Sequence, residues 1–355
     1  MKLFKIYKTY LLSQNNGASA TKLSKILNSK YSHDKITRFL NQSNLSNTNL
    51  WNSVSSDDNF KISLKNSQTC LIIDDTIIPK EYRQETDQAC WHYDHSKGRC
   101  LKGIQYMTCF LTNVQYSLPI NYRIIEKTEK HKDKETQRTK RKSKVTKNEL
   151  FREMLDQSSK KLKSDYKYIL ADSWFCSKDN IKHINDKLQK KFILGIKSNR
   201  LIKLDGTHNF VYKCINKTDL EPEKAYRVKL KGLDIPLVLV KKVFKNGGKG
   251  HFSSGYYISN DLGLTGEQLY NCYQKRWQVE EYHRFIKQNV SIGTSPCRSK
   301  RSVSNHLALS LMAYVDLVYL SKRTKCGIHS LRYQILIKSN KSAFNALQLI
   351  QKSVA

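Results

Sequence analysis

The chain has 355 residues, and its 63 Lys and Arg side chains outnumber 30 Asp and Glu, so the formal net charge is +33. This length exceeds the usual size of one hydrophobic core, and two or three structural units are expected. The basic excess runs along the whole chain and concentrates polyanions, which favours nucleic acid as the partner. A membrane is disfavoured, because no apolar run approaches the ~18 residues of a membrane span.

The cysteines and the N-terminal segment indicate the compartment. Nine cysteines are scattered without a CxxC pair, as expected of reduced thiols. The first residues, "MKLFKIYKTYLLSQNN", hold no signal-peptide core with a small-residue cleavage site. Both features predict a cytoplasmic protein. One stretch, "CWHYDHSKGRC", contains four residues of zinc-binding type, Cys90, His92, His95 and Cys100. Their spacing matches no usual structural-zinc pattern, so the stretch is interpreted as a polar loop.

Residues 1 to about 60 are polar and have a helical period. The stretch "ATKLSKILNSKYSHDKITRFLNQ" gives two short amphipathic segments, the first with Leu23, Ile26 and Leu27 on its apolar side. Ser32 is placed to cap the second segment, which carries Lys35 and Arg38 outward. This pattern is compatible with a helix-turn-helix, so Lys35 and Arg38 are predicted to contact DNA. Any small three-helix unit would show a similar pattern.

The middle of the chain alternates apolar runs with amphipathic segments. Cys70–Ile73 is a short apolar run bounded by acids, as expected of a strand buried on both faces. Further strands are predicted at "KGIQYMTCFLT", "YSLPINYRIIEK", "YKYILADSWF" and "KFILGIKSN", and helices near 148–163 and 178–190. The charged stretch from about 126 to 147 has no apolar period and is predicted to be a mobile loop or a solvated helix start. This order of elements predicts an α/β fold with a mixed sheet.

The remaining chain completes the predicted organisation. Residues of about 198–258 hold Gly-rich turns and alternating segments, which predict an all-β insertion, and helices follow at 266–289, at 302–320 and in the C-terminal tail. We expect an N-terminal helical DNA-binding region, an α/β core in two parts, a β-rich insertion between them and a helical tail. Their expected bounds are 1–65, 66–197 with 259–325, 198–258 and 326–355.

The stretch "YNCYQKRWQVEEYHRFIKQN", residues 270–289, has two distinct faces if it is helical. The apolar face is formed by Cys272, Val279, Tyr282, Phe285 and Ile286. Nearly opposite, an arc of about 60° contains Tyr273, Arg276, Glu280 and Lys287. A solvated face with an Arg276–Glu280 ion pair is one interpretation of this row. A surface that binds a polyanion is the other.

Acidic residues also end two of the predicted buried strands. Asp74 or Asp75 follows "CLII", and Asp172 follows "YILA". Carboxylates at such positions are costly to leave unpaired and usually have a cation or metal beside them. If the two strands are neighbours in one sheet, both acids lie at the same edge.

The order of strand Asp, strand Asp and helix Glu on these elements resembles the RNase H-like catalytic domain of DDE transposases from bacterial insertion sequences. The spacing Tyr273-x2-Arg276-x3-Glu280-x6-Lys287 matches the Tyr-Arg-Glu-Lys signature of one large subgroup at every position. "IIDDTIIPK" and "LADSWF" look like the aspartate segments of that subgroup, which also carries a similar β-rich insertion. The resemblance covers roughly residues 66–320. It implies an RNase H-like mixed sheet as the core.

The resemblance implies a two-metal-ion active site. Asp74, Asp172 and Glu280 would be the catalytic metal ligands for two Mg²⁺ ions, with Mn²⁺ as a substitute, and Asp74 would bridge both. Water would first cleave the end of the element, and the freed 3′-OH would then attack target DNA. Related transposases read Asp, any residue, Thr or Ser at the first acid, which favours Asp74 over Asp75.

The resemblance also implies partners. Tyr273, Arg276 and Lys287 would bind phosphates of the element end. The expected substrate is double-stranded DNA, as terminal inverted repeats and as target, and the protein would act as a homodimer on paired ends at the bacterial nucleoid. Two alternatives stay open. One is an RNase H-like DNA nuclease without strand transfer, and the other is a non-catalytic DNA-binding protein derived from a transposase.

Overall fold

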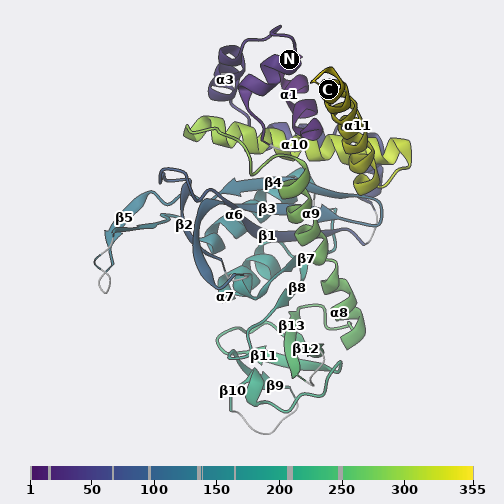
Figure 1. Ribbon diagram of the computed structural model, residues 1–355. Coiled ribbons are helices and arrows are strands. Elements are labelled where there is room, and N and C mark those ends of the chain that lie inside the picture. The colour runs from purple at the N-terminus through teal and green to yellow at the C-terminus, as the bar shows by residue number, and fades with distance from the viewer. Residues whose placement is uncertain are drawn as a thin grey trace. The chain divides into compact units, whose positions relative to one another are not determined.

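The computed structural model describes residues 2–14, 17–65, 68–94, 97–133, 137, 139–163, 165–205, 211–246 and 251–354 (Figure 1). The chain divides into two compact units, and each consists of segments that are far apart in the sequence. The first unit contains Met1–Phe60, Ile77–Gln105 and Glu281–Ala355. The second unit contains Lys61–Thr76 and Tyr106–Glu280.

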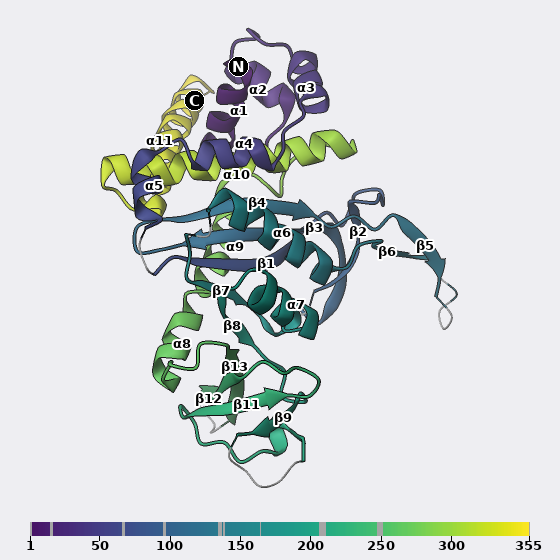
Figure 2. The same cartoon turned by 180° about the vertical axis from the view of Figure 1, so that it is seen from behind.

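The first unit is mainly helical. Its helices are α1 (Lys2–Ser13), α2 (Ala20–Ile26), α3 (His33–Gln42), α4 (Asn47–Val54), the start of α5 (Asp58–Ser63), most of α9 (Trp277–Asn289), α10 (Lys300–Thr324) and α11 (Ile328–Val354). Helices α1, α3 and α4 pack against α10, which runs through the middle of the group (Figures 1 and 2). The helices predicted near 302–320 and in the C-terminal tail are therefore confirmed.

Helix α10 is apolar around much of its circumference. By length and composition it could cross a membrane, and it is the one helix among the described residues that could. The expectation that no apolar run approaches a membrane span is therefore wrong for α10. In the structure, 83% of its most apolar stretch is buried, as in the core helix of a globular unit.

The N-terminal helices are set by their caps. Ser32 Oγ accepts a hydrogen bond from the backbone N–H of Lys35 at 3.2 Å. Helix α3 begins at His33, directly after this cap, as predicted. Ile36 is buried on α3, whereas Lys35 and Arg38 are exposed, also as predicted. Ile26 was expected on the apolar side of α2 but is 53% exposed, because it is the last residue of a helix of only two turns.

A hairpin replaces the polar loop expected at "CWHYDHSKGRC". Strand β2 (Ala89–Asp94) pairs antiparallel with the first half of β3 (Arg99–Thr112). The loop interpretation was wrong because β2 has a strand period: Cys90 and His92 are buried on one side, with Cys90 Sγ 3.4 Å from His92 Nε2. Cys100 is exposed, and His95 lies outside the described residues.

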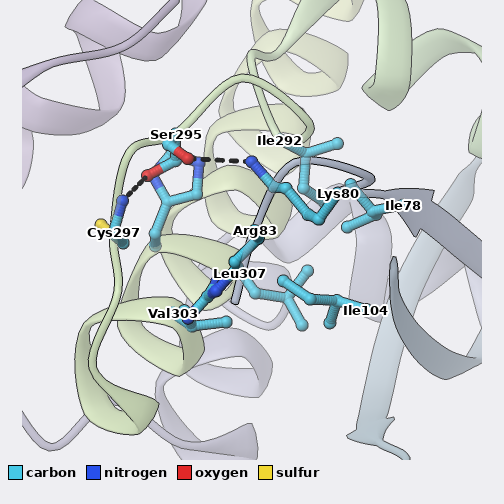
Figure 3. Close-up of a pocket in the computed structure, with 10 residues that line it drawn as sticks. Ile78, Lys80, Arg83, Ile104, Ile292, Ser295, Cys297, Val303 and Leu307 are labelled. Atoms are coloured by element: carbon cyan, nitrogen blue, oxygen red, sulfur yellow. Dashed lines mark hydrogen bonds between the residues drawn. The ribbon is translucent and has the colours of Figure 1, made fainter. Parts of the chain in front are cut away.

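The segment between α9 and α10 is held by two cations (Figure 3). Lys80 Nζ donates hydrogen bonds to the carbonyl oxygens of Gly293 at 2.7 Å and of Ser295 at 2.8 Å. Arg83 donates to the carbonyl oxygen of Arg298. Burial, together with the neighbouring Arg83, lowers the pKa of Lys80. Both side chains therefore serve as donors for carbonyl groups that have no regular secondary structure to pair with.

The second unit is built on a mixed sheet. Its strands follow the order β10-β9-β11-β12-β13-β8-β7-β1-β3, and β4 pairs with β3. Parallel pairing joins β1 to β7 and β7 to β8, whereas the other described pairs are antiparallel. The bounds are β1 (Cys70–Pro79), β4 (Ser117–Ile124), β7 (Tyr168–Ala171), β8 (Lys191–Gly195), β9 (Leu201–Leu204), β10 (Lys213–Cys214), β11 (Ala225–Leu230), β12 (Leu237–Asn246) and β13 (His251–Ser259). The predicted α/β class with a mixed sheet is confirmed.

Helices accompany this sheet. Helix α6 (Lys147–Lys161) packs on β4 and on α7 (Lys178–Lys182), and α7 continues as a π-helical turn (His183–Lys187). Helix α8 (Gly266–Gln274) packs on β8, β12 and β13. The strands at 201–259 extend the same sheet, because β13 pairs with β8.

Two predicted elements of the chain are wrong. The helix expected at 266–289 is divided, because the backbone N–H groups of Lys275 and Arg276 bond to carbonyls three residues back. These 3₁₀-type bonds end α8 before α9 begins. The stretch at 126–147, expected to be a loop or a helix start, contains a two-stranded ribbon of β5 (Glu129–Lys132) and β6 (Thr139–Lys142). Its strands are held by backbone pairing without an apolar period.

A buried histidine links distant parts of the first unit. His306 Nε2 lies 3.1 Å from the carbonyl oxygen of Ser291, which can only accept, so Nε2 carries the proton. The other ring nitrogen then accepts from the Tyr7 hydroxyl at 3.0 Å. Burial lowers the pKa of His306 to about 4. The neutral ring therefore fits both partners.

Acid is expected to destabilise the chain through His306. Its pKa rises from about 4 in the folded chain to about 6.5 when unfolded, so the unfolded state binds a proton first as the pH falls. The contribution of neutral His306 to the free energy of unfolding is therefore fully present above pH ~6.5 and declines toward pH 4. About 2 kcal/mol of it is lost between pH 7 and pH 5. Urea unfolding of wild type and of His306→Gln at both pH values measures this loss. An equal pH dependence in the two proteins would contradict the assignment.

Candidate active site

Two parallel strands bring Asp74 and Asp172 to the same level of the sheet. In the register of β1 and β7, Ile73 is the partner of Ala171, and each aspartate is the next residue. Asp172 directly follows β7 and caps the next 3₁₀ turn, since its Oδ1 accepts from the backbone N–H of Trp174 at 3.0 Å. This bond fixes one carboxylate oxygen of Asp172.

Asp74 and Asp75 contact different partners. Strand β1 does not end at these acids, as the sequence suggested, but continues to Pro79, so neighbouring side chains point to opposite faces. Asp75 accepts hydrogen bonds from Lys147 Nζ at 3.0 Å, at the start of α6. Asp74 instead lies 3.5 Å from Arg276 Nη1. The two acids are therefore separated by the strand geometry.

Arg276 bridges Asp74 and Glu280. One terminal nitrogen of its guanidinium contacts Asp74, and the other donates to Glu280 Oε1. Only 18% of the Arg276 side chain is exposed, against 15% for Asp74 and 31% for Glu280. Within the part of the chain that the structure describes, Arg276 Nε is buried without a hydrogen-bond partner. The sequence suggested a solvated Arg276–Glu280 ion pair. In the structure this pair is largely buried and also includes Asp74.

Burial sets the electrostatics of this group. It raises the pKa of Asp74 to about 7, although the nearby Arg276 guanidinium acts in the opposite direction. It also raises the pKa of Asp172, again against the effect of Arg276. For Arg276 itself, burial would lower the pKa, but Tyr273, Asp74 and Glu280 raise it overall. One guanidinium therefore does not compensate the burial of these carboxyl groups, and a further cation would stabilise their charged forms.

Tyr273 is a packed residue. Its ring lies against Tyr257, with centroids 4.5 Å apart, and burial raises the pKa of its hydroxyl. A Cβ atom on Gly195 would lie 3.1 Å from Tyr273 Oη and 3.0 Å from the backbone nitrogen of Ser173. Only glycine allows this close approach without displacing its neighbours. Tyr273 Oη therefore lies close to Gly195, the last residue of β8.

Other predicted DNA-binding residues lie in the first unit. Lys287 is on the later part of α9 and is half-buried, whereas Lys35 and Arg38 are exposed on α3. Tyr273 and Arg276 are thus brought together with Asp74, Asp172 and Glu280 in the second unit. The role of all these residues in binding DNA stays a prediction.

Sequence reasoning missed three residues beside the acids. Trp174 follows Asp172 by two positions and is 44% exposed, with Lys147 Nζ at 5.3 Å and Lys197 Nζ at 5.4 Å from its ring centroid. An exposed tryptophan flanked by two ammonium groups can stack on a base while the lysines contact phosphates. The signal in the sequence was the tryptophan of "LADSWF".

Gln278 anchors the start of α9. Its side-chain oxygen accepts from Ser117 Oγ at 2.6 Å and from the Thr112 hydroxyl. These contacts tie the first turn of α9 to β3 and β4. Since Glu280 lies two residues further on, they fix the height of its carboxylate above the sheet.

The donor set is that of a hard cation. Asp74, Asp172 and Glu280 offer carboxylate oxygens, which suit Mg²⁺ or Mn²⁺ and not a structural zinc ion. Among the described residues, however, no group of three or more His, Cys, Asp or Glu side chains is drawn together closely enough to hold a metal ion. Arg276 lies between Asp74 and Glu280. The ligand chemistry fits, provided that this guanidinium moves aside.

Comparison with known proteins gives the family. A sequence profile described as DDE superfamily endonuclease matches residues 2–209, which is more than half of the chain. The chain belongs to this DDE endonuclease family. The match includes Asp74 and Asp172 and ends before Glu280. Endonucleases of this superfamily act on DNA and generally use divalent metal ions, in keeping with the carboxylates described above.

One known protein is similar to this chain over a short segment. A "probable transposase for insertion sequence element IS5377" of Geobacillus stearothermophilus is 32% identical over 68 residues. The segment covers 19% of this chain and 18% of that protein, so the chain spans less than a fifth of the relative it matches.

The two neighbouring aspartates should differ in effect. Asp74→Asn is expected to remove metal-dependent DNA cleavage without a comparable loss of stability, because burial already disfavours the charged form of Asp74. Asp75→Asn should keep a measurable fraction of cleavage but lose about 1 kcal/mol, since Lys147 loses its charged partner. Plasmid nicking and urea unfolding measure the two effects. If the effects are exchanged, Asp75 takes the role assigned to Asp74.

Proposed function

We propose that the chain is a cut-and-paste transposase that cleaves the ends of its insertion sequence and joins the 3′-OH ends to target DNA. The proposal is carried by the grouping of Asp74 and Glu280 around Arg276 beside Asp172, in the order and spacing of the Tyr-Arg-Glu-Lys signature. The name of the Geobacillus stearothermophilus relative supports it. The strand order β4-β3-β1-β7-β8 supports an RNase H-like core.

The proposed cofactor is a pair of Mg²⁺ ions, for which Mn²⁺ can substitute. Held by Asp74, Asp172 and Glu280, they would activate the attacking oxygen and stabilise the leaving 3′ oxygen. Burial already raises the pKa of Asp74 and of Asp172, so both carboxyl groups gain from a nearby cation.

The residues of the chain hold and orient the DNA in this proposal. Arg276 neutralises Asp74 and Glu280 in the structure, and its guanidinium becomes available for a DNA phosphate once those acids have another cation. Tyr273 packs against Tyr257 and lies beside Gly195, and thereby positions Arg276, three residues further on. Gln278 keeps Glu280 in place from the other side.

The wider assembly is proposed from the same function. Lys35 and Arg38, exposed on α3, together with Lys287 on α9, contribute contacts to the terminal inverted repeats. Two copies of the chain hold the paired ends of one element. The net charge of +33 supports binding of both element and target DNA.

The acids should separate cleavage from binding. Glu280→Gln or Asp172→Asn is expected to lower Mg²⁺-dependent cleavage by more than about 100-fold, since even partners of metal ligands contribute 10–100-fold. Binding of the element end, measured by gel shift, should stay nearly intact. Glu281→Gln is the matched control, because this exposed neighbour carries the same charge. Full cleavage by Glu280→Gln would rule out the proposed site.

Strand transfer needs its own measurement. A pre-cleaved element end with a free 3′-OH, incubated with supercoiled plasmid and Mg²⁺, should be joined to the plasmid by the wild-type chain. Cleavage without joining would identify the chain as a nuclease of the same fold. Binding without either reaction would identify a non-catalytic DNA-binding protein.

A further inference from the structure

The ribbon of β5 and β6 is a separate two-stranded sheet. In Figures 1 and 2 it extends away from the large sheet of its own unit. All residues of its two strands are exposed except Arg141, which is half-buried. The ribbon therefore presents its side chains to whatever binds the protein there.

The register divides the ribbon into two unlike faces. Partners directly opposite in an antiparallel pair share a face. Lys130 is opposite Arg141, and Lys132 is opposite Thr139, which gives one face with cations and no acid in the two strands. The other face contains Glu129 opposite Lys142 and His131 opposite Lys140, and Lys140 also pairs with Asp133. Here "cationic face" means Lys130, Lys132 and Arg141, and "mixed face" means the residues of the opposite side.

The sequence of the ribbon does little to stabilise its two strands. Neither "EKHK" nor "TKRK" contains an apolar residue, so the two strands bury no hydrophobic side chain. An isolated two-stranded hairpin is at best marginally stable in water. The like charges of Lys130 and Arg141, directly opposite each other, destabilise it further. A local conflict of this kind is typical of a functional surface, because a bound polyanion would remove the repulsion.

We infer that the cationic face of this ribbon binds the phosphate backbone of duplex DNA, as an arm separate from the carboxylates. The inference rests on the proposed function, in which duplex DNA is the substrate. The major groove, about 12 Å wide, admits a two-stranded β-ribbon. Duplex DNA also supplies the repeated negative charge that the cations of this face match. Because phosphate contacts carry no sequence information, this arm would bind DNA without recognising its sequence.

The test compares two double variants with the same change in charge. Lys130→Gln/Lys132→Gln removes two cations from the cationic face, and Lys140→Gln/Lys142→Gln removes two from the mixed face. Binding to a 30-base-pair duplex without divalent metal is measured between 50 and 200 mM salt. The first variant should lower the slope of log K against log salt by about 1.8, since each phosphate contact contributes ~0.9. The second should lower it by less than half of that.

A second measurement reports the ribbon directly. Addition of duplex DNA to the wild-type chain should slow amide hydrogen exchange in β5 and β6, because DNA stabilises a ribbon that is marginal alone. The same sequence as single-stranded DNA should protect it less. Equal protection by both would overturn the binding of duplex DNA by the ribbon.

The outcomes distinguish the ribbon from the proposed function. Equal loss of salt dependence in both double variants, or none in either, overturns the ribbon while cleavage and joining by the wild-type chain still support a transposase. Duplex binding with the expected difference but without cleavage supports the ribbon and overturns the transposase. If the wild-type chain does not bind duplex DNA, both proposals fail.

Discussion

The Arg276 guanidinium is the contact on which the candidate site depends. Burial raises the pKa of Asp74 and of Asp172, so these carboxyl groups occupy positions that disfavour charge. Arg276 reaches Asp74 with one nitrogen and Glu280 with another, which joins strand β1 to helix α9 through a single cation. Without it, the carboxylates would repel one another in a poorly solvated place. The arrangement is tolerated because arginine has two donors on one rigid fork.

The position of Arg276 depends on the interruption between α8 and α9. A continuous helix would have kept Tyr273 and Glu280 on one face at a fixed angle. The 3₁₀-type bonds at Lys275 and Arg276 end α8 instead, so each helix can pack separately. Tyr273 then packs against Tyr257, and Gln278 accepts hydrogen bonds from β3 and β4. Helical periodicity could not predict this, because no proline or glycine marks the interruption.

Burial and chain order made most of the fold predictable. Apolar runs such as Cys70–Ile73 and the segment before Asp172 are strands, because a strand buried on both faces has such an uninterrupted run. Ser32 marked the start of α3. The pairing of Asp75 with Lys147 and of Asp74 with Arg276 was beyond the sequence, because it depends on how far β1 continues. The ribbon at β5 and β6 was missed because backbone pairing, and not an apolar pattern, defines it.

The basic charge of the chain is thus divided between two physical roles. Arg276 is largely buried and has fixed partners, so it holds Asp74 and Glu280 in place. Lys130 and Lys132 are exposed on a ribbon without a hydrophobic core, so they attract a polyanion through electrostatic interactions that salt weakens. In the proposed function a long polymer such as DNA engages both, because exposed cations would hold it while a single phosphodiester reaches the carboxylates. The net charge of the chain therefore indicates a polyanionic partner. The burial of each cation indicates whether it would bind DNA phosphates or hold the carboxylates in place.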